Sequence, residues 1–149
     1  MTFDSVDAWL EDARSRLRRL SAAEAAQAVE EGAVLVDIRP EWQRRDDGEV
    51  PGSVIIETNH IAWRVHPESG ARLRIAKPDT RWVLLCTEGY TSSVVADWLV
   101  SLGLDATDVE GGIHAWREAG FPTTVGPTPI EHRVGDPERI PRADAQAMH

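Results

Sequence analysis

The chain has 149 residues, a length that suits one domain, and its 42% hydrophobic and 28% charged residues are ordinary values for a globular protein. Its net charge of -9, from 16 Lys and Arg against 25 Asp and Glu, argues against general binding to the phosphate backbones of nucleic acids. No apolar run approaches the roughly 20 residues that cross a bilayer, and the N-terminus lacks the apolar core of a signal peptide. The chain has one cysteine, so no intrachain disulfide can form. We therefore expect a cytoplasmic protein.

The first part of the chain predicts two helices and a buried strand. Apolar residues at helical spacing indicate a short amphipathic helix over 5–19 that runs into a basic stretch. A second helix is predicted to start at Ser21, because Ser21 and Glu24 have the spacing of a capping box, and to end at Gly32. The apolar run 33–38 then predicts a strand that is buried on both faces, as in a parallel sheet.

Strand and helix patterns alternate along the rest of the chain. This alternation predicts an α/β fold with an open, mostly parallel sheet. The expected elements are a short helix at 40–45, a strand at 53–57, a short helix at 58–65, a polar loop at 66–80, a strand at 81–86, a helix at 91–103, a strand at 106–110 and a helix at 111–120.

Cys86 is the candidate for chemistry, because it ends a predicted buried strand and precedes a glycine-containing loop that opens a helix. Ligand sites in parallel α/β sheets lie at the carboxyl ends of strands. Loop amides that form an anion nest, together with the positive end of the following helix, favour the nucleophilic thiolate, and Ser92 and Ser93 can add hydroxyl donors. The alternative from position alone is a buried structural cysteine.

Three segments resemble the single-domain rhodaneses, a family of sulfurtransferases. CTEGYTS (86–92) resembles the active-site loop C-x-x-G-x-R-S, LVDIRPEWQRRDDGEVPGS (35–53) is similar to the family's L-[IV]-D-[VI]-R…P-G-A stretch, and GGIHAWREAGFP (111–122) is similar to its GG-x-x-x-W ending. The resemblance covers about residues 15–123. It implies a five-stranded parallel sheet with helices on both faces, and a persulfide carried by Cys86.

This resemblance also sets the expected domain organisation. Residues 1–14 are interpreted as an N-terminal helical extension and 15–123 as the rhodanese-like domain. The remaining residues, 124–149, contain prolines and lack periodicity, so we expect an extended or disordered tail.

The loop departs from the family pattern at the fifth residue after the cysteine. The usual arginine is Thr91 here, and Glu88 further opposes an anion. A charge-assisted hydrogen bond contributes about 1.5–3 kcal/mol, so we expect weaker use of thiosulfate. Rhodanese-like phosphatases and arsenate reductases have an arginine at the sixth position, where this chain has Ser92, which argues against phosphoryl chemistry.

Other residues have both a structural and a functional interpretation. Asp37 and Arg39 form either a structural ion pair at a strand end or a site cation, and Arg64 is either a second candidate cation or a surface residue. Trp63 occupies a segment that lies near the pocket mouth in the family. The histidines do not have the spacing of metal ligands. The candidate substrate-binding set is Thr87, Glu88, Gly89, Tyr90, Thr91, Ser92, Arg39 and Arg64.

Two hypotheses about function follow. The first is a sulfurtransferase that moves a sulfane sulfur through a Cys86 persulfide from a small donor to cyanide, a thiol or a protein acceptor, with no metal or organic cofactor and no nucleic-acid or membrane partner. The second is a catalytically weak binding or sulfur-sensing module that keeps the fold. The cysteine favours the first hypothesis and the missing loop arginine favours the second, while the oligomeric state is left open by the sequence.

Overall fold

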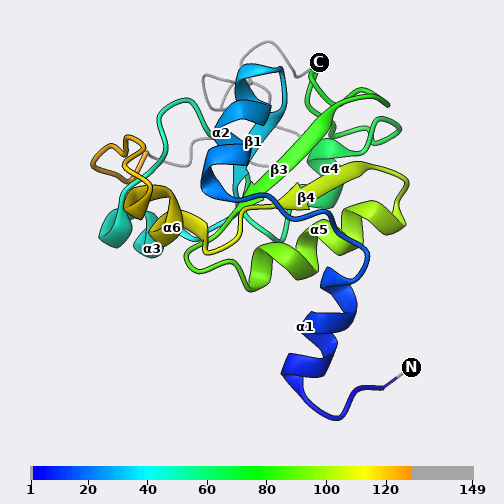
Figure 1. Cartoon of the computed structure of the whole chain (residues 1–149). Helices are drawn as coiled ribbons and strands as arrows, with labels where there is room; N and C mark the ends of the chain where they lie inside the picture. The colour runs from blue at the N-terminus through cyan, green and yellow to red at the C-terminus, as the bar shows by residue number, and fades with distance from the viewer. Residues whose placement is uncertain (1, 129–149) are drawn as a thin grey trace.

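A computed structural model describes residues 2–128, and its centre is a parallel sheet (Figure 1). The four strands are ordered β2-β1-β3-β4 and all neighbours are parallel. The strands are β1 (Val34–Asp37), β2 (Val54–Ile55), β3 (Arg81–Leu85) and β4 (Asp105–Asp108). Each of the four strands predicted by the sequence pattern is present, and the parallel arrangement is confirmed.

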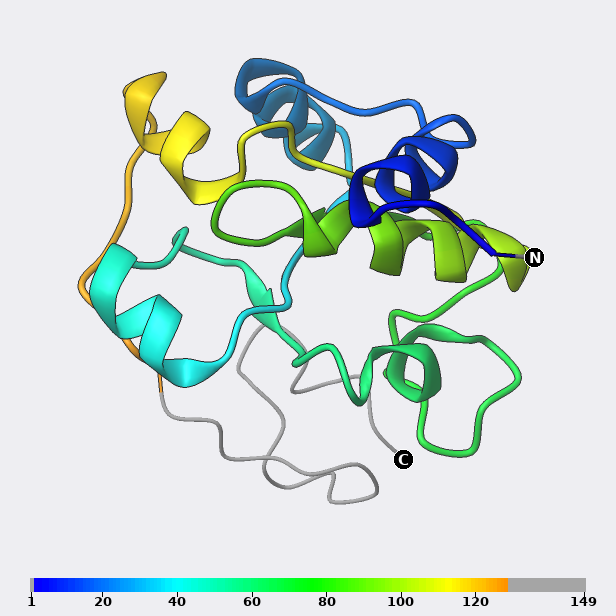
Figure 2. The ribbon, with the colours of Figure 1, turned by 90° about the horizontal axis from the view of Figure 1, so that it is seen from below.

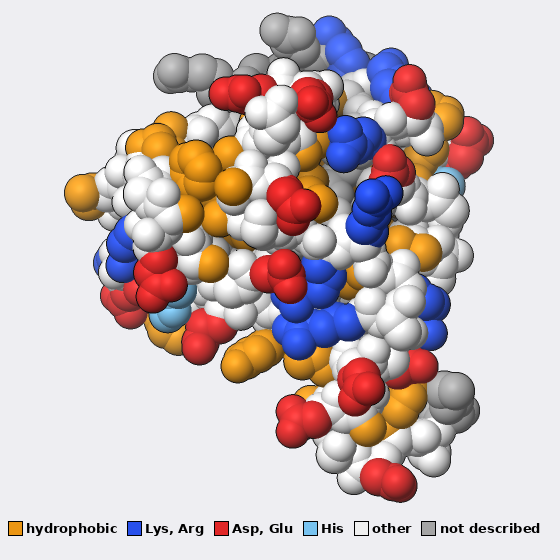
Figure 3. Space-filling view, viewed as in Figure 1, with side chains coloured by type: hydrophobic (Ala, Val, Ile, Leu, Met, Phe, Trp, Pro, Cys, Tyr) orange, Lys and Arg blue, Asp and Glu red, His pale blue; other side chains and the backbone are white. Residues whose placement is uncertain are grey.

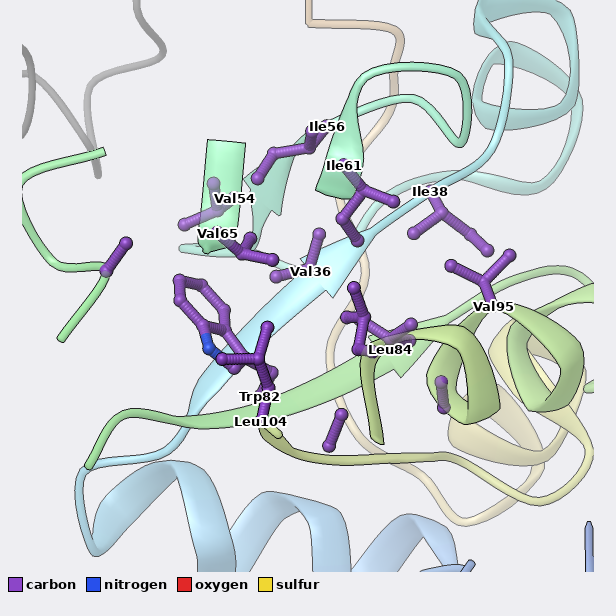
Figure 4. Packing of buried hydrophobic residues seen from close by; sticks show 14 of the residues in the cluster. Val36, Ile38, Val54, Ile56, Ile61, Val65, Trp82, Leu84, Val95 and Leu104 are labelled. Atoms are coloured by element: carbon purple, nitrogen blue, oxygen red, sulfur yellow. The ribbon is translucent and has the colours of Figure 1, made fainter. Parts of the chain in front are cut away.

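Helices cover both faces of the sheet, as the alternating pattern predicts. They are α1 (Val6–Arg14), α2 (Ala22–Glu30), α3 (Glu41–Asp47), α4 (Ile61–Val65), α5 (Thr91–Ser101) and α6 (Gly112–Glu118). One apolar cluster packs α4 and α5 on the sheet through Val36 and Leu84 (Figure 4). A second cluster packs α2 and α6 through the adjacent residues Leu35 and Val83, and these two helices lie together on one side in Figure 2. Successive strand residues point to opposite faces, so burial on both faces explains the continuous apolar runs.

The expected count of five strands is wrong by one among the described residues. Beyond β4, only Leu20 extends the sheet, as a single parallel bridge to Val109. The Leu20 amide donates to the Asp108 carbonyl at 3.1 Å, and its carbonyl accepts from the Glu110 amide at 2.8 Å. Pairing stops there because the next residue, Ser21, already caps α2.

Helix boundaries agree with the sequence where a cap defines them. Ser21 and Glu24 form the predicted capping box, with N–O distances of 3.1 and 2.8 Å. The first helix ends at Arg14, five residues earlier than predicted, because the chain must extend to bring Leu20 to the sheet edge. The predicted tail at 124–149 lies mostly outside the described residues. In the described part, no helix is long and apolar enough to cross a membrane.

A close backbone contact places the residue that follows β3. The Cys86 carbonyl accepts from the Ile113 amide at 2.9 Å, at the start of α6. A Cβ on Gly112 would lie 2.3 Å from the Cys86 carbonyl oxygen and 2.6 Å from the Thr87 carbonyl carbon. The second glycine of the GG pair therefore lets α6 support the backbone of the 86–91 connection from behind.

Gly112→Ala is expected to destabilise the protein far more than Gly120→Ala. Both glycines have positive φ, at 58° and 84°, but a Cβ at Gly120 meets nothing within 4 Å. Gly120→Ala should cost about 1–2 kcal/mol of unfolding free energy from backbone strain alone. Gly112→Ala should cost about 1–3 kcal/mol more, because backbone must move. Urea unfolding measures both, and equal losses would contradict the close-approach explanation.

Candidate active site

Cys86 directly follows β3 and lies at the carboxyl edge of the sheet, where α5 begins. Its side chain is buried, with 7% of the residue exposed. Residues 87–90 connect it to α5, and this connection lies between α3 and the β4–α6 turn (Figure 2). Thr87 ties the connection to α3 through a 3.0 Å hydrogen bond from its hydroxyl to the Gln43 side-chain oxygen.

Three donors or acceptors from the loop surround the Cys86 sulfur. The Gly89 amide nitrogen lies 3.2 Å from Sγ and the Ser92 amide nitrogen lies 3.4 Å from it, and both donate to the sulfur. The Ser92 hydroxyl oxygen is 3.2 Å from Sγ and accepts from the thiol. Gly89 has a φ of 86°, a conformation that glycine adopts without strain, and this turns its amide inward. Backbone donors thus converge on an atom that becomes negatively charged when the thiol ionises.

A buried carboxylate lies behind the sulfur. Asp108, at the end of β4, is fully buried and pairs with Arg19 at 2.8 Å. Its Oδ2 atom also accepts from the Ser92 hydroxyl at 2.7 Å and from the Ser93 hydroxyl at 2.8 Å. A chain of contacts therefore runs from Arg19 through Asp108 and Ser92 to the Cys86 sulfur.

Two arginines from the N-terminal segment hold the outer side of the loop. Arg14 Nη2 donates to the Gly89 carbonyl at 2.6 Å, and Arg19 Nη2 donates to the same oxygen at 3.0 Å. Arg14 also donates from Nε to the Ser93 hydroxyl and lies 5.8 Å from the centre of the Tyr90 ring. Basic side chains gather beside the junction of α1 with the rest of the molecule (Figure 3). Positive charge therefore reaches the loop from a distant part of the sequence.

The remaining loop residues of the candidate set differ in their environment. Ser92 is fully buried against the sulfur. Glu88 and Thr91 are exposed, and Thr91 is the first residue of α5. Tyr90 is 59% exposed under Arg14. The loop thus presents its backbone to the sulfur and most of its side chains to solvent.

The two candidate cations outside the loop are buried and bonded to other groups. Arg39 pairs with Asp37 through Nε and Nη2 at 2.9 and 2.7 Å, and Nη2 also donates to the Gly48 carbonyl at 2.7 Å. Both members of this pair have no exposed side-chain surface. Arg64 is also fully buried and donates to the Ala71 carbonyl at 2.7 Å. These contacts brace the connections after β1 and α4.

The sequence interpretation missed Arg14, Arg19 and Asp108. The only local signals were the basic stretch that follows the first predicted helix and an acidic residue three positions before the GG motif. The ion pair joins residues 89 positions apart, so no sequence spacing connects them. They meet because Leu20 docks beside β4.

An apolar groove of about 520 Å³ lies between α4 and α5 at the same edge of the sheet. Ile38 and Thr58, which follow β1 and β2, line it together with the indole rings of Trp63 and Trp98. Trp63 is 60% exposed, so its ring forms part of an open rim. In the described residues, no group of three His, Cys, Asp or Glu side chains could hold a metal ion.

Comparison with known proteins gives a consistent result. The sequence model of the rhodanese-like domain matches residues 21–119. The thiosulfate sulfurtransferase GlpE of Pseudomonas syringae pv. syringae is 32% identical over 104 residues, which are 69% of this chain and 90% of that protein.

Solved structures give the same fold. A protein of unknown function from Rhodopseudomonas palustris, described as a possible tyrosine phosphatase, is 30% identical with a TM-score of 0.73 and covers 83% of this chain and 98% of its own. A rhodanese-related protein from Thermoplasma volcanium, 24% identical with a TM-score of 0.59, covers 73% of this chain and 99% of its own and shares the fold.

Ser92→Ala is expected to slow alkylation of Cys86 by iodoacetamide at pH 7 by about tenfold. The hydroxyl lies 3.2 Å from Sγ and can turn its hydrogen to the thiolate, and a hydrogen bond to a charged group contributes about 1.5 kcal/mol. Ser93→Ala is the matched control: Ser93 is equally buried and also donates to Asp108, whereas it is the Ser92 hydroxyl that bonds to the sulfur. We expect a smaller change there, of about threefold, because Ser93 acts on the sulfur only through Asp108. Equal effects of the two substitutions would show that the hydroxyl at Ser92 has no special relation to the sulfur.

Proposed function

The chain belongs to the rhodanese-like family of sulfurtransferases, and on this premise we propose that it carries a sulfane sulfur as a persulfide on Cys86. The observation that carries the proposal is the convergence of the Gly89 and Ser92 amides on Sγ, at 3.2 and 3.4 Å. These donors stabilise negative charge on sulfur without a metal ion or an organic cofactor.

The first half of the reaction loads the cysteine. The Cys86 thiolate attacks the outer sulfur of thiosulfate, a Cys–S–S bond forms, and the bond between the two thiosulfate sulfurs breaks. The electron pair of that bond leaves with sulfite, and the outer sulfur of the persulfide keeps one negative charge. The loop amides favour the thiolate that starts this step.

The second half regenerates the thiolate. A nucleophilic acceptor attacks the outer sulfur, the persulfide S–S bond breaks, and its electron pair returns to the Cys86 sulfur. Cyanide becomes thiocyanate in this step, and a thiolate acceptor becomes a persulfide. We propose a small thiol or a protein thiol as the acceptor in the cell.

The donor preference depends on charge near the loop. Thr91 brings no charge, and the exposed Glu88 opposes an anionic donor. We therefore propose that thiosulfate, a dianion, is a weaker donor than a sulfane-sulfur compound that carries less negative charge. The substrate-binding roles of Thr87, Gly89 and Tyr90 belong to the same proposal.

Two other functions are less well supported. A phosphoryl oxyanion needs a cation opposite the nucleophile, and Ser92 occupies the position where rhodanese-like phosphatases have an arginine. The absence of a loop arginine favours a binding or sensing module with slow turnover. That module would form a stable persulfide on Cys86 that added acceptors do not remove.

Cys86→Ser is expected to abolish sulfur transfer and leave folding nearly unchanged, because the two side chains have similar shapes and oxygen cannot hold a persulfide. Intact mass after incubation with glutathione persulfide should show one added sulfur atom in the native protein and none in the variant. The circular-dichroism spectra of the two proteins should agree. Turnover by the serine variant would exclude Cys86 as the carrier.

Thr91→Arg is expected to raise kcat/KM for thiosulfate by about tenfold, the effect of roughly 1.4 kcal/mol of added charge-assisted binding. The exposed position at the start of α5 can hold a longer side chain. Thr91→Gln adds length without charge and is the control. An equal gain in the glutamine variant, or with an uncharged trisulfide donor, would contradict the charge argument.

A further inference from the structure

We propose that Arg19 is a positioning residue for Cys86: its ion pair with Asp108 releases the Ser92 hydroxyl to donate to the cysteine thiolate. The inference rests on the proposed function, in which Cys86 reacts as a negatively charged thiolate. It extends the site beyond residues 21–119, the part matched by the family, because Arg19 lies before that range.

Asp108 carries a buried charge that needs partners. A carboxylate with no exposed surface is unfavourable unless charged and hydrogen-bonding partners surround it. Arg19 supplies both kinds of partner, since Nε lies 2.8 Å from Oδ1 and Nη2 lies 3.1 Å from Oδ2. The Arg19 side chain is only 15% exposed, so water competes weakly for this pair.

Ser92 can donate to only one of its two neighbours at a time. Its hydroxyl has one hydrogen, and in the thiol form this hydrogen points to Asp108 while the oxygen accepts from the cysteine. When Cys86 ionises, the thiol hydrogen is gone and the sulfur needs donors. The Ser92 hydroxyl can then rotate toward the sulfur, provided that Asp108 remains satisfied without it.

Arg19 and Ser93 meet that condition. Asp108 retains two hydrogen bonds from Arg19 and one from the Ser93 hydroxyl at 2.8 Å. Arg14 donates from Nε to the Ser93 oxygen at 3.0 Å. The Ser93 hydrogen has two acceptors in reach, and the charged carboxylate of Asp108 at 2.8 Å is favoured over the Gly89 carbonyl at 3.2 Å. Without Arg19, the carboxylate would hold the Ser92 hydrogen and would also repel the thiolate.

The position of Arg19 is set by backbone contacts on its C-terminal side. Leu20 is bonded to the Asp108 carbonyl at 3.1 Å and to the Glu110 amide at 2.8 Å. Arg19 therefore approaches Asp108 from a fixed point at the sheet edge. Charged or titratable groups on the elements around Cys86 include Arg14 at the end of α1, Arg19, Asp108 on β4, Glu88 and Tyr90 in the loop, and the Asp37–Arg39 pair after β1. Asp47 of α3 and His114 of α6 lie 3.6 Å apart, and Asp97 of α5 pairs with Arg16 at 2.7 Å.

The test is a double-mutant cycle on the pH dependence of Cys86 alkylation. The variants are Arg19→Gln, Asp108→Asn and the two combined, and the exposed neighbour Arg18→Gln is the matched control. Cys86 is the single cysteine of the chain, so iodoacetamide uptake by the full-length protein reports on it alone.

Arg19→Gln is expected to raise the midpoint of the pH–rate profile by about one unit, which is about tenfold slower alkylation below the midpoint. In the Asp108→Asn background the same substitution should move the midpoint by less than about 0.3 unit, since no carboxylate remains to compensate. Arg18→Gln should leave it unchanged. An equal shift in both backgrounds, or no shift in folded Arg19→Gln, would overturn the proposal.

Arg19→Lys keeps the test open if Arg19→Gln does not fold. Lysine preserves the charge but replaces the two-point contact with Asp108 by a single one, so its midpoint should rise by less than about half a unit; a shift of a full unit would overturn the proposal. Alkylation needs no sulfur donor, which separates the two claims. If the native protein transfers no sulfur but the double-mutant cycle shows the expected midpoint shifts, only the proposed function is refuted.

Discussion

The buried carboxylate of Asp108 is the constraint on which the organisation of the site depends. Its burial is tolerable only because Arg19, Ser92 and Ser93 all donate to it. Satisfying this one group brings together the end of β4, the start of α5 and the segment before α2. The contact of Ser92 with the Cys86 sulfur is a consequence of that assembly.

A second constraint is the close approach of backbone to backbone around the loop. Gly89 turns its amide to the sulfur with a positive φ, and its carbonyl faces two arginines on the other side. Gly112 lets α6 touch the carbonyl group of Cys86. A chain with a net charge of -9, which is unfavourable for anions, thereby still surrounds the Cys86 sulfur with local donors.

Much of the fold could be predicted from local pattern. The apolar runs at 33–38 and 81–86 predicted buried strands because both faces of a parallel sheet are covered, and the capping box at Ser21 predicted the start of α2 to the residue. The fifth strand, expected from resemblance, is reduced to the single bridge at Leu20. No local pattern could limit that pairing to one residue, because its length depends on where α2 must begin relative to the sheet edge.

The sequence by itself determined the alternation of strands and helices, the family resemblance and the position of Cys86 at a strand end before a helix. These features are local, since each depends on residues within a few positions of one another. Tertiary structure alone decided which cations reach the loop: Arg14 and Arg19 hold Gly89, while Arg39 is bound to Asp37. The physical reason is that ion pairs form between groups that packing brings together. Arg19 and Asp108 are 89 positions apart in the sequence, and they meet because Leu20 docks beside β4. No pattern of sequence spacing could indicate this contact.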